Sequence, residues 1–205
     1  RMQGPPPVDP FPQVVGITGH HTCAKRAYEI GEWYRSRGSV VVFGGLHVQA
    51  CADECRPHAD TIVFGDGIQV WEQILRDIEH DCLKQEYSGS YRRPFSEDPA
   101  PRRSVVPKDQ FLTSASVIAT RGCHNRCNFC YLSTEGMHMP YSMRSVSQIV
   151  REIEMEKATY VVFIDNNLGS KKHYMRELCS ALEPMNIIWS AAVTIDVTDD
   201  PDLVR

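Results

Sequence analysis

Residues 115–130 read ASVIATRGCHNRCNFC. The apolar run at 115–119 predicts a strand, and Cys123, Cys127 and Cys130 follow it with the spacing C-x-x-x-C-x-x-C. A short loop that leaves the end of a strand can turn three sulfurs toward one point, and thiolates are ligands of soft metals and of iron–sulfur clusters. The stretch therefore predicts a metal-binding loop on a strand end.

The number of cysteines in the loop narrows the choice of metal. A closed structural zinc site takes four protein ligands and a ferredoxin cluster takes four cysteines, but the next cysteine here is Cys179, outside the loop. One coordination position is left open, as catalysis at a metal requires. Two alternatives stay open: a zinc site completed by His124 or His138, and thiols that bind no metal.

With Phe129 directly before its last cysteine, the loop resembles the signature of the radical S-adenosylmethionine (SAM) superfamily. The resemblance implies that Cys123, Cys127 and Cys130 hold a 4Fe-4S cluster whose free iron binds the methionine part of SAM. Phe129 would lie along the adenine. The resemblance further implies reductive cleavage of SAM to a 5′-deoxyadenosyl radical, and an electron donor such as flavodoxin or ferredoxin.

Composition sets the broad class. The chain has 205 residues, of which 42% are apolar and 23% charged, as in an ordinary globular protein. A net charge of −4 without a basic run gives no sign of nucleic-acid binding. No apolar stretch approaches the roughly 20 residues that span a bilayer, and no signal peptide opens the sequence. A cytoplasmic enzyme with a small-molecule substrate is expected, and the cysteine usage favours a reducing compartment.

Residues 1–12 are rich in proline and are expected to be disordered. After them, strand and helix patterns alternate with short loops that contain glycine. This order predicts a doubly wound, Rossmann-like α/β domain over residues 13–83. The predicted strands are 13–18, 39–43 and 61–64, and the predicted helices are 23–37, 52–56 and 68–81.

Glycine-containing loops follow the three predicted strands, where ligands of doubly wound sheets bind. They resemble the C-terminal part of the cobalamin-binding domain that precedes many radical SAM domains, with Thr18 in place of the serine of a Ser-x-Leu element. Ordinary turns of an α/β sheet are the alternative. The residues that the resemblance assigns to cobalamin are Thr18, Gly44, Gly45, His47, Gly65 and Gly67.

The histidine motif that ligates cobalt in that family would lie before residue 1, so the chain is expected to be truncated at its start.

A second group of soft ligands falls in the same domain. His47, Cys51, Cys55 and His58 have the spacing H-x-x-x-C-x-x-x-C-x-x-H, which offers four ligands for zinc. The alternative is that His47 belongs to the cobalamin pattern and that the cysteines pack in the core.

Residues 84–112 are polar and interrupted by prolines, which predicts an interdomain linker. From residue 113 to 205, βα units predict the first part of a TIM-type barrel with its site at the carboxyl rim. Ser145 and Gln148 form a capping box, Ser170 is expected to cap the next helix, and a last helix begins at Asp199 or Asp200. Because the family's barrel has six such units, truncation at the C-terminal end is expected as well.

Asp165, Asn166 and Asn167 follow the second strand of this partial barrel. They resemble an Asp-Asp-Asn element that binds the amino group of SAM in this subfamily. A turn with Asx caps is the alternative. Ser190, Thr194 and Asp196 are further polar residues near the third strand, without an assigned role.

These features lead to one principal functional hypothesis and two alternatives. The resemblance implies a radical SAM enzyme, and in the first place a cobalamin-dependent methyltransferase. Within enzymes, the alternative is a radical SAM cyclase, oxidoreductase or methylthiotransferase that uses no cobalamin. Outside enzymes, it is a non-catalytic interaction module with a zinc-filled cysteine loop. A fragment without the remaining strands is expected to be inactive by itself.

Overall fold

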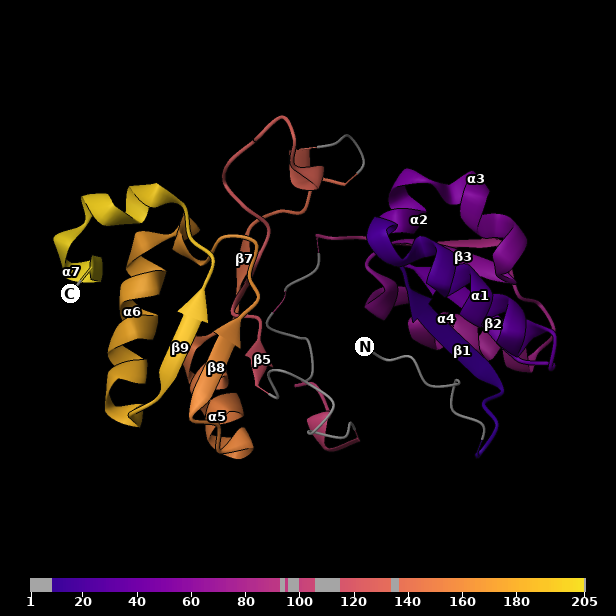
Figure 1. Ribbon diagram of the computed structural model, residues 1–205, viewed down its shortest axis with the longest axis horizontal. Coiled ribbons are helices and arrows are strands. Elements are labelled where there is room, and N and C mark those ends of the chain that lie inside the picture. The colour runs from indigo at the N-terminus through magenta and orange to yellow at the C-terminus, as the bar shows by residue number, and fades with distance from the viewer. Residues whose placement is uncertain (1–8, 93–94, 96–99, 106–114, 134–136, 205) are drawn as a thin grey trace. The chain divides into compact units, whose positions relative to one another are not determined.

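The computed structural model describes residues 9–92, 95, 100–105, 115–133 and 137–204. They fall into two compact units, unit 1 (Arg1–Tyr91) and unit 2 (Arg92–Arg205). Each unit is an α/β structure with a parallel sheet, shown in Figure 1. In the described part of the chain, no helix has the length and apolar character needed to cross a bilayer.

Unit 1 contains a four-stranded sheet in the order β1-β2-β3-β4, with all neighbours parallel. The first three strands confirm the sequence prediction: β1 (Val14–Thr18), β2 (Val40–Gly44) and β3 (Thr61–Gly65). The fourth strand, β4 (Glu86–Gly89), lies in the stretch predicted as linker. That part of the prediction is wrong, because only Tyr87 of this strand is buried and the sequence has no apolar run to reveal it.

Helices cover both faces of the sheet of unit 1. Val41 and Phe43 of β2 pack with α1 (Ala24–Arg35), α2 (Leu46–Ala50) and α3 (Ala52–Cys55) in one core. Val42, whose side chain points to the opposite face, packs with α4 (Gly67–Glu79) in the other core. A strand buried on both faces explains why β2 reads as a continuous apolar run. The two cores make unit 1 a doubly wound, Rossmann-like layer structure.

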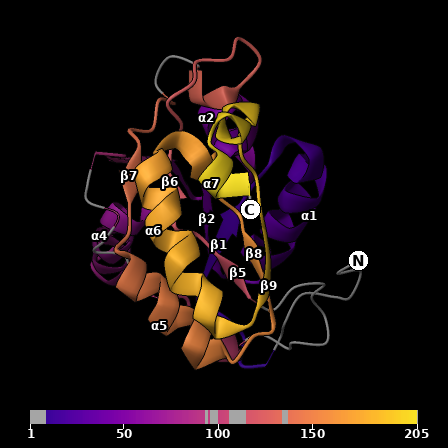
Figure 2. The same ribbon diagram turned by 90° about the vertical axis from the view of Figure 1, so that its left-hand side faces the viewer.

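Unit 2 is built on a three-stranded parallel sheet in the order β5-β8-β9. The strands are β5 (Ser116–Val117), β8 (Tyr160–Phe163) and β9 (Ile188–Ala191). Helices α5 (Val146–Glu156) and α6 (Lys172–Leu182) contact each other and pack with the sheet in one core (Figure 2). The strand–helix alternation matches the prediction, but the described strands form an open sheet and barrel closure is not shown.

One of the predicted helix starts in unit 2 is confirmed, and two others differ from the prediction. Ser145 and Gln148 form the predicted capping box at the start of α5. Ser170 does not cap α6: the helix starts after Lys171, and the Ser170 hydroxyl is buried without a hydrogen-bond partner. The last helix, α7 (Pro201–Val204), begins one to two residues after the predicted start, because a 3₁₀ helix occupies Ile195–Asp199.

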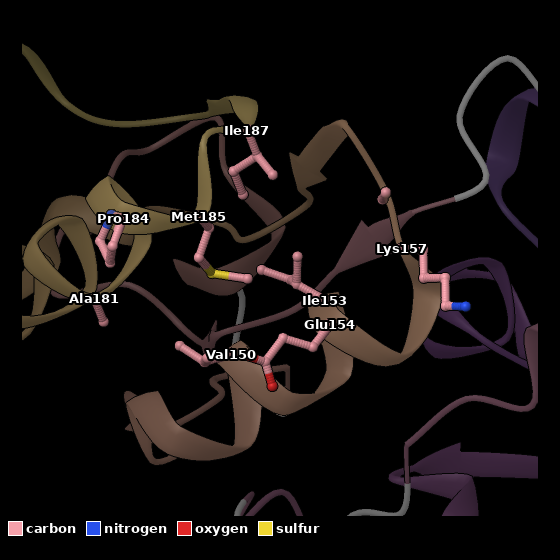
Figure 3. A pocket seen from close by; sticks show the side chains of 9 residues that line it. Val150, Ile153, Glu154, Lys157, Ala181, Pro184, Met185 and Ile187 are labelled. Carbon is pink, nitrogen blue, oxygen red and sulfur yellow. The ribbon is translucent and has the colours of Figure 1, made fainter.

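A shallow groove of about 440 Å³ lies between the C-terminal ends of α5 and α6 (Figure 3). It borders the chain that leads into β8 and β9, so it lies at the amino ends of these strands. The groove is thus at the opposite end of the sheet from the cysteine loop. Its apolar lining includes Val150, Ile153, Ala181, Pro184, Met185 and Ile187.

We expect Leu178→Ala to destabilise unit 2 by about 2–5 kcal/mol, because the side chain is fully buried and its removal leaves a cavity in the core. Met155→Ala is the matched control, since that side chain is 79% exposed. Native-state hydrogen exchange of the β8 amides measures the change. Equal exchange rates in the two variants would contradict the packing described here.

Candidate metal and cofactor site

The cysteine loop begins and ends in a short antiparallel ribbon that the sequence did not predict. β6 (Thr120–Arg121) pairs with β7 (Ser142–Met143) and brings the two ends of the loop together. Gly122 follows β6 with a φ of +79°, and a Cβ there would lie 2.6 Å from the Met139 carbonyl oxygen. Only glycine fits this position. The loop therefore leaves the ribbon in a single, tightly restricted direction, past the carboxyl ends of β5 and β8 (Figure 1).

The three cysteines of the loop differ in exposure and in hydrogen bonding. Cys123 is partly buried, and its sulfur accepts hydrogen bonds from the Asn125 amide (3.4 Å) and from Asn167 Nδ2 (3.7 Å). Cys127 is exposed, and its carbonyl accepts from the amide of the partly buried Cys130 at 3.0 Å. N–H groups directed at sulfur are the usual surroundings of thiolate ligands in iron–sulfur proteins.

The arrangement of the thiols bears on which metal they could hold. Over the residues that the structure describes, the only three His, Cys or carboxylate ligand atoms within 4.8 Å of one another belong to His21, His47 and Cys51 in unit 1. The loop cysteines thus do not gather with His124 or His138 around a point for one zinc ion. A 4Fe-4S cluster takes each thiolate on a different iron, so its ligand sulfurs lie farther apart than those around a single ion. The donor set fits a three-cysteine cluster.

Asp165, two residues after the end of β8, is 5% exposed, and its carboxylate faces the start of the loop. It accepts hydrogen bonds from the Ala119 amide (3.2 Å), the Thr120 amide and the Thr120 hydroxyl (2.6 Å). Burial raises the pKa of the Asp165 carboxyl, and the bonds from Thr120 and Ala119 oppose that shift. The carboxylate is thus engaged inside the chain, which favours a role in holding the loop over direct contact with an amino group.

The side chains of Asn166 and Asn167 also form hydrogen bonds to the cysteine loop. Asn166 is exposed; its Oδ1 accepts from the Gly122 amide at 3.3 Å, and its Nδ2 donates to the Tyr131 hydroxyl at 2.7 Å. Asn167 is 2% exposed, and its Nδ2 donates to Thr194 Oγ1 at 3.0 Å as well as to the Cys123 sulfur. Three consecutive residues after β8 therefore hold three successive points of the cysteine loop. We call them the loop clamp.

The sequence could not assign the partners of the loop clamp. Tyr131 and Asn125 lie in the loop but belong to no motif, and Thr194 appeared only as a polar residue without a role.

Phe129 is 94% exposed, so its ring is available to an incoming ligand. Asp196 lies beside Thr194, whose hydroxyl lowers the pKa of the Asp196 carboxyl and keeps a negative charge near the end of β9.

In unit 1, the predicted glycine loops do lie together at the carboxyl edge of the sheet. Thr18 pairs in register with Gly44, and the Gly19 amide donates to the Gly44 carbonyl at 2.9 Å. Gly45 has a φ of +94°, and a Cβ on it would lie 2.8 Å from the Gly19 carbonyl oxygen. Gly65 has a φ of +68°, and a Cβ there would overlap the Gly89 carbonyl. Close approach within the fold already explains Gly45 and Gly65, whereas Thr18 is exposed and Gly67 has room around it.

The four residues of unit 1 with the spacing H-x-x-x-C-x-x-x-C-x-x-H do not all come together. His47 is 3% exposed, and its Nε2 lies 2.6 Å from the Tyr28 hydroxyl. His58 instead bonds to Glu32 at 2.6 Å and stacks on the Tyr28 ring. Cys55 is fully buried, with its sulfur 3.7 Å from the Tyr28 hydroxyl. A four-ligand zinc site is therefore not formed, because His58 and Cys55 have other partners. Cys55 packs in the core, as the alternative interpretation expected.

Comparison with known proteins finds two curated relatives and no matching family model. The chain is 29% identical to a bacteriochlorophyllide d C-8(2)-methyltransferase of Chlorobaculum tepidum, over 94% of this chain and 46% of the relative. It is 26% identical to a bacteriochlorophyllide d C-12(1)-methyltransferase of the same organism, over 94% and 44%. The chain thus spans about half the length of the curated relatives it matches.

Among solved structures, the N-terminal domain of a hypothetical protein from Thermotoga maritima overlaps with 43% of this chain and 78% of its own. The sequence identity is 23% and the TM-score is 0.33, which is too low to support a conclusion about fold or function.

We expect Asp165→Ala to weaken the attachment of the cysteine loop by about 2–4 kcal/mol, because it leaves buried N–H and O–H donors without an acceptor. In hydrogen exchange, amides of residues 117–123 should then exchange at least about 30-fold faster. Asp199→Ala, at an exposed carboxylate, is the control. Unchanged exchange in Asp165→Ala would show that the clamp does not hold the loop.

Proposed function

We propose that unit 2 binds a 4Fe-4S cluster through Cys123, Cys127 and Cys130, and that the chain contributes to a radical SAM methyltransferase. The single observation that supports this most is the attachment of the cysteine loop at the carboxyl edge of a parallel sheet by the loop clamp. Active sites of βα structures lie at that edge. A loop with three thiols and no fourth cysteine leaves one position open for a substrate.

The curated relatives support the reaction class. Both are named as methyltransferases that act on carbon positions of bacteriochlorophyllide d, and both alignments cover 94% of this chain. The alignments therefore extend over both units and are not confined to the cysteine loop. We infer methyl transfer to a carbon atom as the reaction, with a bacteriochlorophyllide as the first substrate to test.

When bound, the cluster supplies the electron that cleaves SAM reductively. The residues of the chain place and surround it. Asn167 and Asn125 donate N–H groups toward the Cys123 sulfur, which stabilises negative charge there. Phe129 offers an exposed aromatic face to the adenine, and the exposed amide of Asn166 can meet the polar groups of the methionine part. Asp165 contributes by holding the strand end and makes no contact that we assign to SAM.

Cobalamin is the further proposal for unit 1, and it rests on the sequence pattern. Thr18 is exposed at this edge, and a Cβ on Gly44 or Gly67 would meet no atom closer than 3.7 Å. Gly45 and Gly65 do not add to this support, because the fold itself requires them, and His47 is buried against Tyr28. We therefore assign no reaction step to this cofactor. A visible-spectrum titration with hydroxocobalamin tests for binding. The Gly67→Leu variant, whose larger side chain would block this edge of the sheet, should not bind.

We expect anaerobic reconstitution with iron and sulfide to give a brown chain with about four irons and an absorbance shoulder near ~400 nm. The Cys123→Ser, Cys127→Ser and Cys130→Ser variants should each lose most of that absorbance. Cys82→Ser, at an exposed cysteine of unit 1, is the matched control and should keep it.

Two results would count against the enzymatic proposal. Stoichiometric zinc without the visible band would favour the non-catalytic module. The electron paramagnetic resonance spectrum of the reconstituted cluster should change when SAM is added. An unchanged spectrum would support the cluster but contradict the proposal that it binds SAM. Methyl transfer itself is measured with methyl-labelled SAM and bacteriochlorophyllide d under strong reductant.

We also expect Asn167→Ala to lower the reduction potential of the cluster, because the lost N–H···S bond no longer stabilises the more negative, reduced state. A redox titration followed by electron paramagnetic resonance measures this without any turnover. Asn186→Ala, at an exposed turn, is the control. A potential equal to that of the unsubstituted chain would mean that Asn167 does not act on Cys123.

A further inference from the structure

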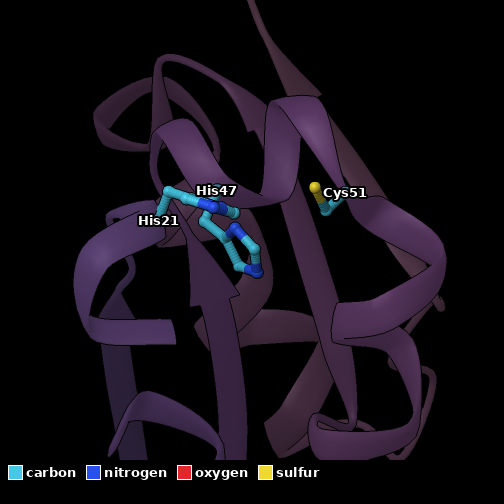
Figure 4. Close-up of side chains that lie close together, drawn as sticks. All are labelled: His21, His47 and Cys51. Atoms are coloured by element: carbon cyan, nitrogen blue, oxygen red, sulfur yellow. The ribbon is translucent and has the colours of Figure 1, made fainter. Parts of the chain in front are cut away.

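The carboxyl edge of the sheet in unit 1 contains a group of soft ligands that the cysteine loop does not involve. One ring nitrogen of His21, one of His47 and the sulfur of Cys51 all lie within 4.8 Å of one another (Figure 4). The two imidazole rings are tilted against each other, with centroids 5.5 Å apart. The sequence spacing grouped His47 and Cys51 with Cys55 and His58, whereas in the structure the third ligand is His21, which follows the neighbouring strand β1.

The fold brings these three residues together through the backbone. His47 and Cys51 are four residues apart, and the Cys51 amide donates to the His47 carbonyl at 2.8 Å, so both side chains lie on one side of a helical turn. The His47 amide donates to the Gly19 carbonyl at 3.1 Å, which fixes the start of α2 against the end of β1. His21 follows two residues after Gly19, in a 3₁₀ helix at His21–Cys23.

The buried imidazole of His47 supplies a second, independent observation. Its Nε2 is taken by the Tyr28 hydroxyl at 2.6 Å, but its Nδ1 is buried and has no hydrogen-bond partner in the described part of the chain. A buried polar atom without a partner is uncommon and costly, so it calls for a ligand. A metal ion bound at Nδ1 would satisfy it.

The surroundings of Tyr28 fit the same arrangement. If Nε2–H of His47 donates to the Tyr28 oxygen, the Tyr28 hydroxyl is left to donate to the Cys55 sulfur, 3.7 Å away. Histidines that bind metals usually have their other ring nitrogen fixed in this way. Nδ1 then carries the free lone pair.

We propose that His21, His47 and Cys51 bind a divalent transition-metal ion, with zinc as the ion that best suits two imidazoles and one thiolate. Tetrahedral zinc bond lengths place such ligand atoms about 3.3–3.6 Å apart, so the three atoms, now within 4.8 Å of one another, must close in when the ion binds. The exposed His21 and the half-buried Cys51 are the side chains that can move. Binding replaces the Cys51 thiol proton by the metal, and that proton leaves to solvent. Glu54, whose carboxylate is 3.9 Å from His47 Nε2, adds a negative charge that favours a cation.

Three protein ligands leave the fourth position of the ion open. The site lies where ligands of doubly wound sheets bind, next to the end of β1. The ion in unit 1 can therefore hold or polarise a ligand bound at this edge. This site goes beyond the proposed function, because it requires neither the cysteine loop nor SAM.

The test uses the full chain with Cys123, Cys127 and Cys130 all changed to Ser, so that metal binding by the loop cannot contribute. We titrate it with Co²⁺ and follow the charge-transfer band of the cobalt–thiolate bond, then displace Co²⁺ with Zn²⁺. We expect one ion per chain. In this background Cys51→Ser should abolish the band, and His21→Asn should weaken Co²⁺ binding at least 10-fold. His20→Asn, at the neighbouring exposed histidine, is the matched control and should bind as the background does.

Tyr28→Phe supplies a separate readout, since it removes the oxygen beside His47 and keeps the aromatic ring. We expect 10- to 100-fold weaker Co²⁺ binding with an unchanged circular dichroism spectrum. The assignment is overturned if the background chain takes up no ion at 100 μM Co²⁺, or if Cys51→Ser retains the thiolate band. It is also overturned if His20→Asn weakens binding as much as His21→Asn does. None of these outcomes depends on whether the loop holds a cluster, so this site and the proposed function can fail separately.

Discussion

The position of the cysteine loop depends on a single buried carboxylate, that of Asp165. Its bonds to Ala119 and Thr120 join the end of β8 to the chain that leaves β5, so two neighbouring parallel strands present their ends at a fixed offset. Asn166 and Asn167 then reach Gly122 and Cys123. A shift of β8 by one residue would turn Asp165 to the other face of the sheet. The register of β8 therefore determines where the cysteine loop is attached.

The sequence predicted the parts of the fold that local patterns specify. The apolar runs of β2 and β3 and the capping box at Ser145 were sufficient, because buried strands and helix starts carry their own composition. It failed for β4, β6 and β7, which are two to four residues long and mostly polar. Their pairing is decided by partners distant in sequence, and no periodicity marks them. Ser170 failed as a cap because it lies at the end of a 3₁₀ helix, Leu168–Ser170, and α6 starts only after Lys171.

The candidate sites show the same division. Three cysteines within eight residues are visible in the sequence, and so are the residues Asp165, Asn166 and Asn167. What the sequence did not contain was the partner of each side chain: the Asp165 carboxylate accepts hydrogen bonds from Ala119 and Thr120 inside the chain. His21 was missed for a related reason: it approaches His47 only because β1 and β2 run parallel and end together. Spacing along one chain segment cannot show a ligand that comes from the neighbouring strand.

The groove between the C-terminal ends of α5 and α6 has a practical consequence. It opens at the amino ends of the strands, whereas the cysteine loop leaves their carboxyl ends. The groove and the loop therefore lie at opposite ends of the same sheet. Enlarging a small side chain there, such as Ala181, would fill apolar space without touching the loop clamp. That end of the sheet is therefore a region where the thermal stability of unit 2 can be raised while the cysteine loop stays unchanged.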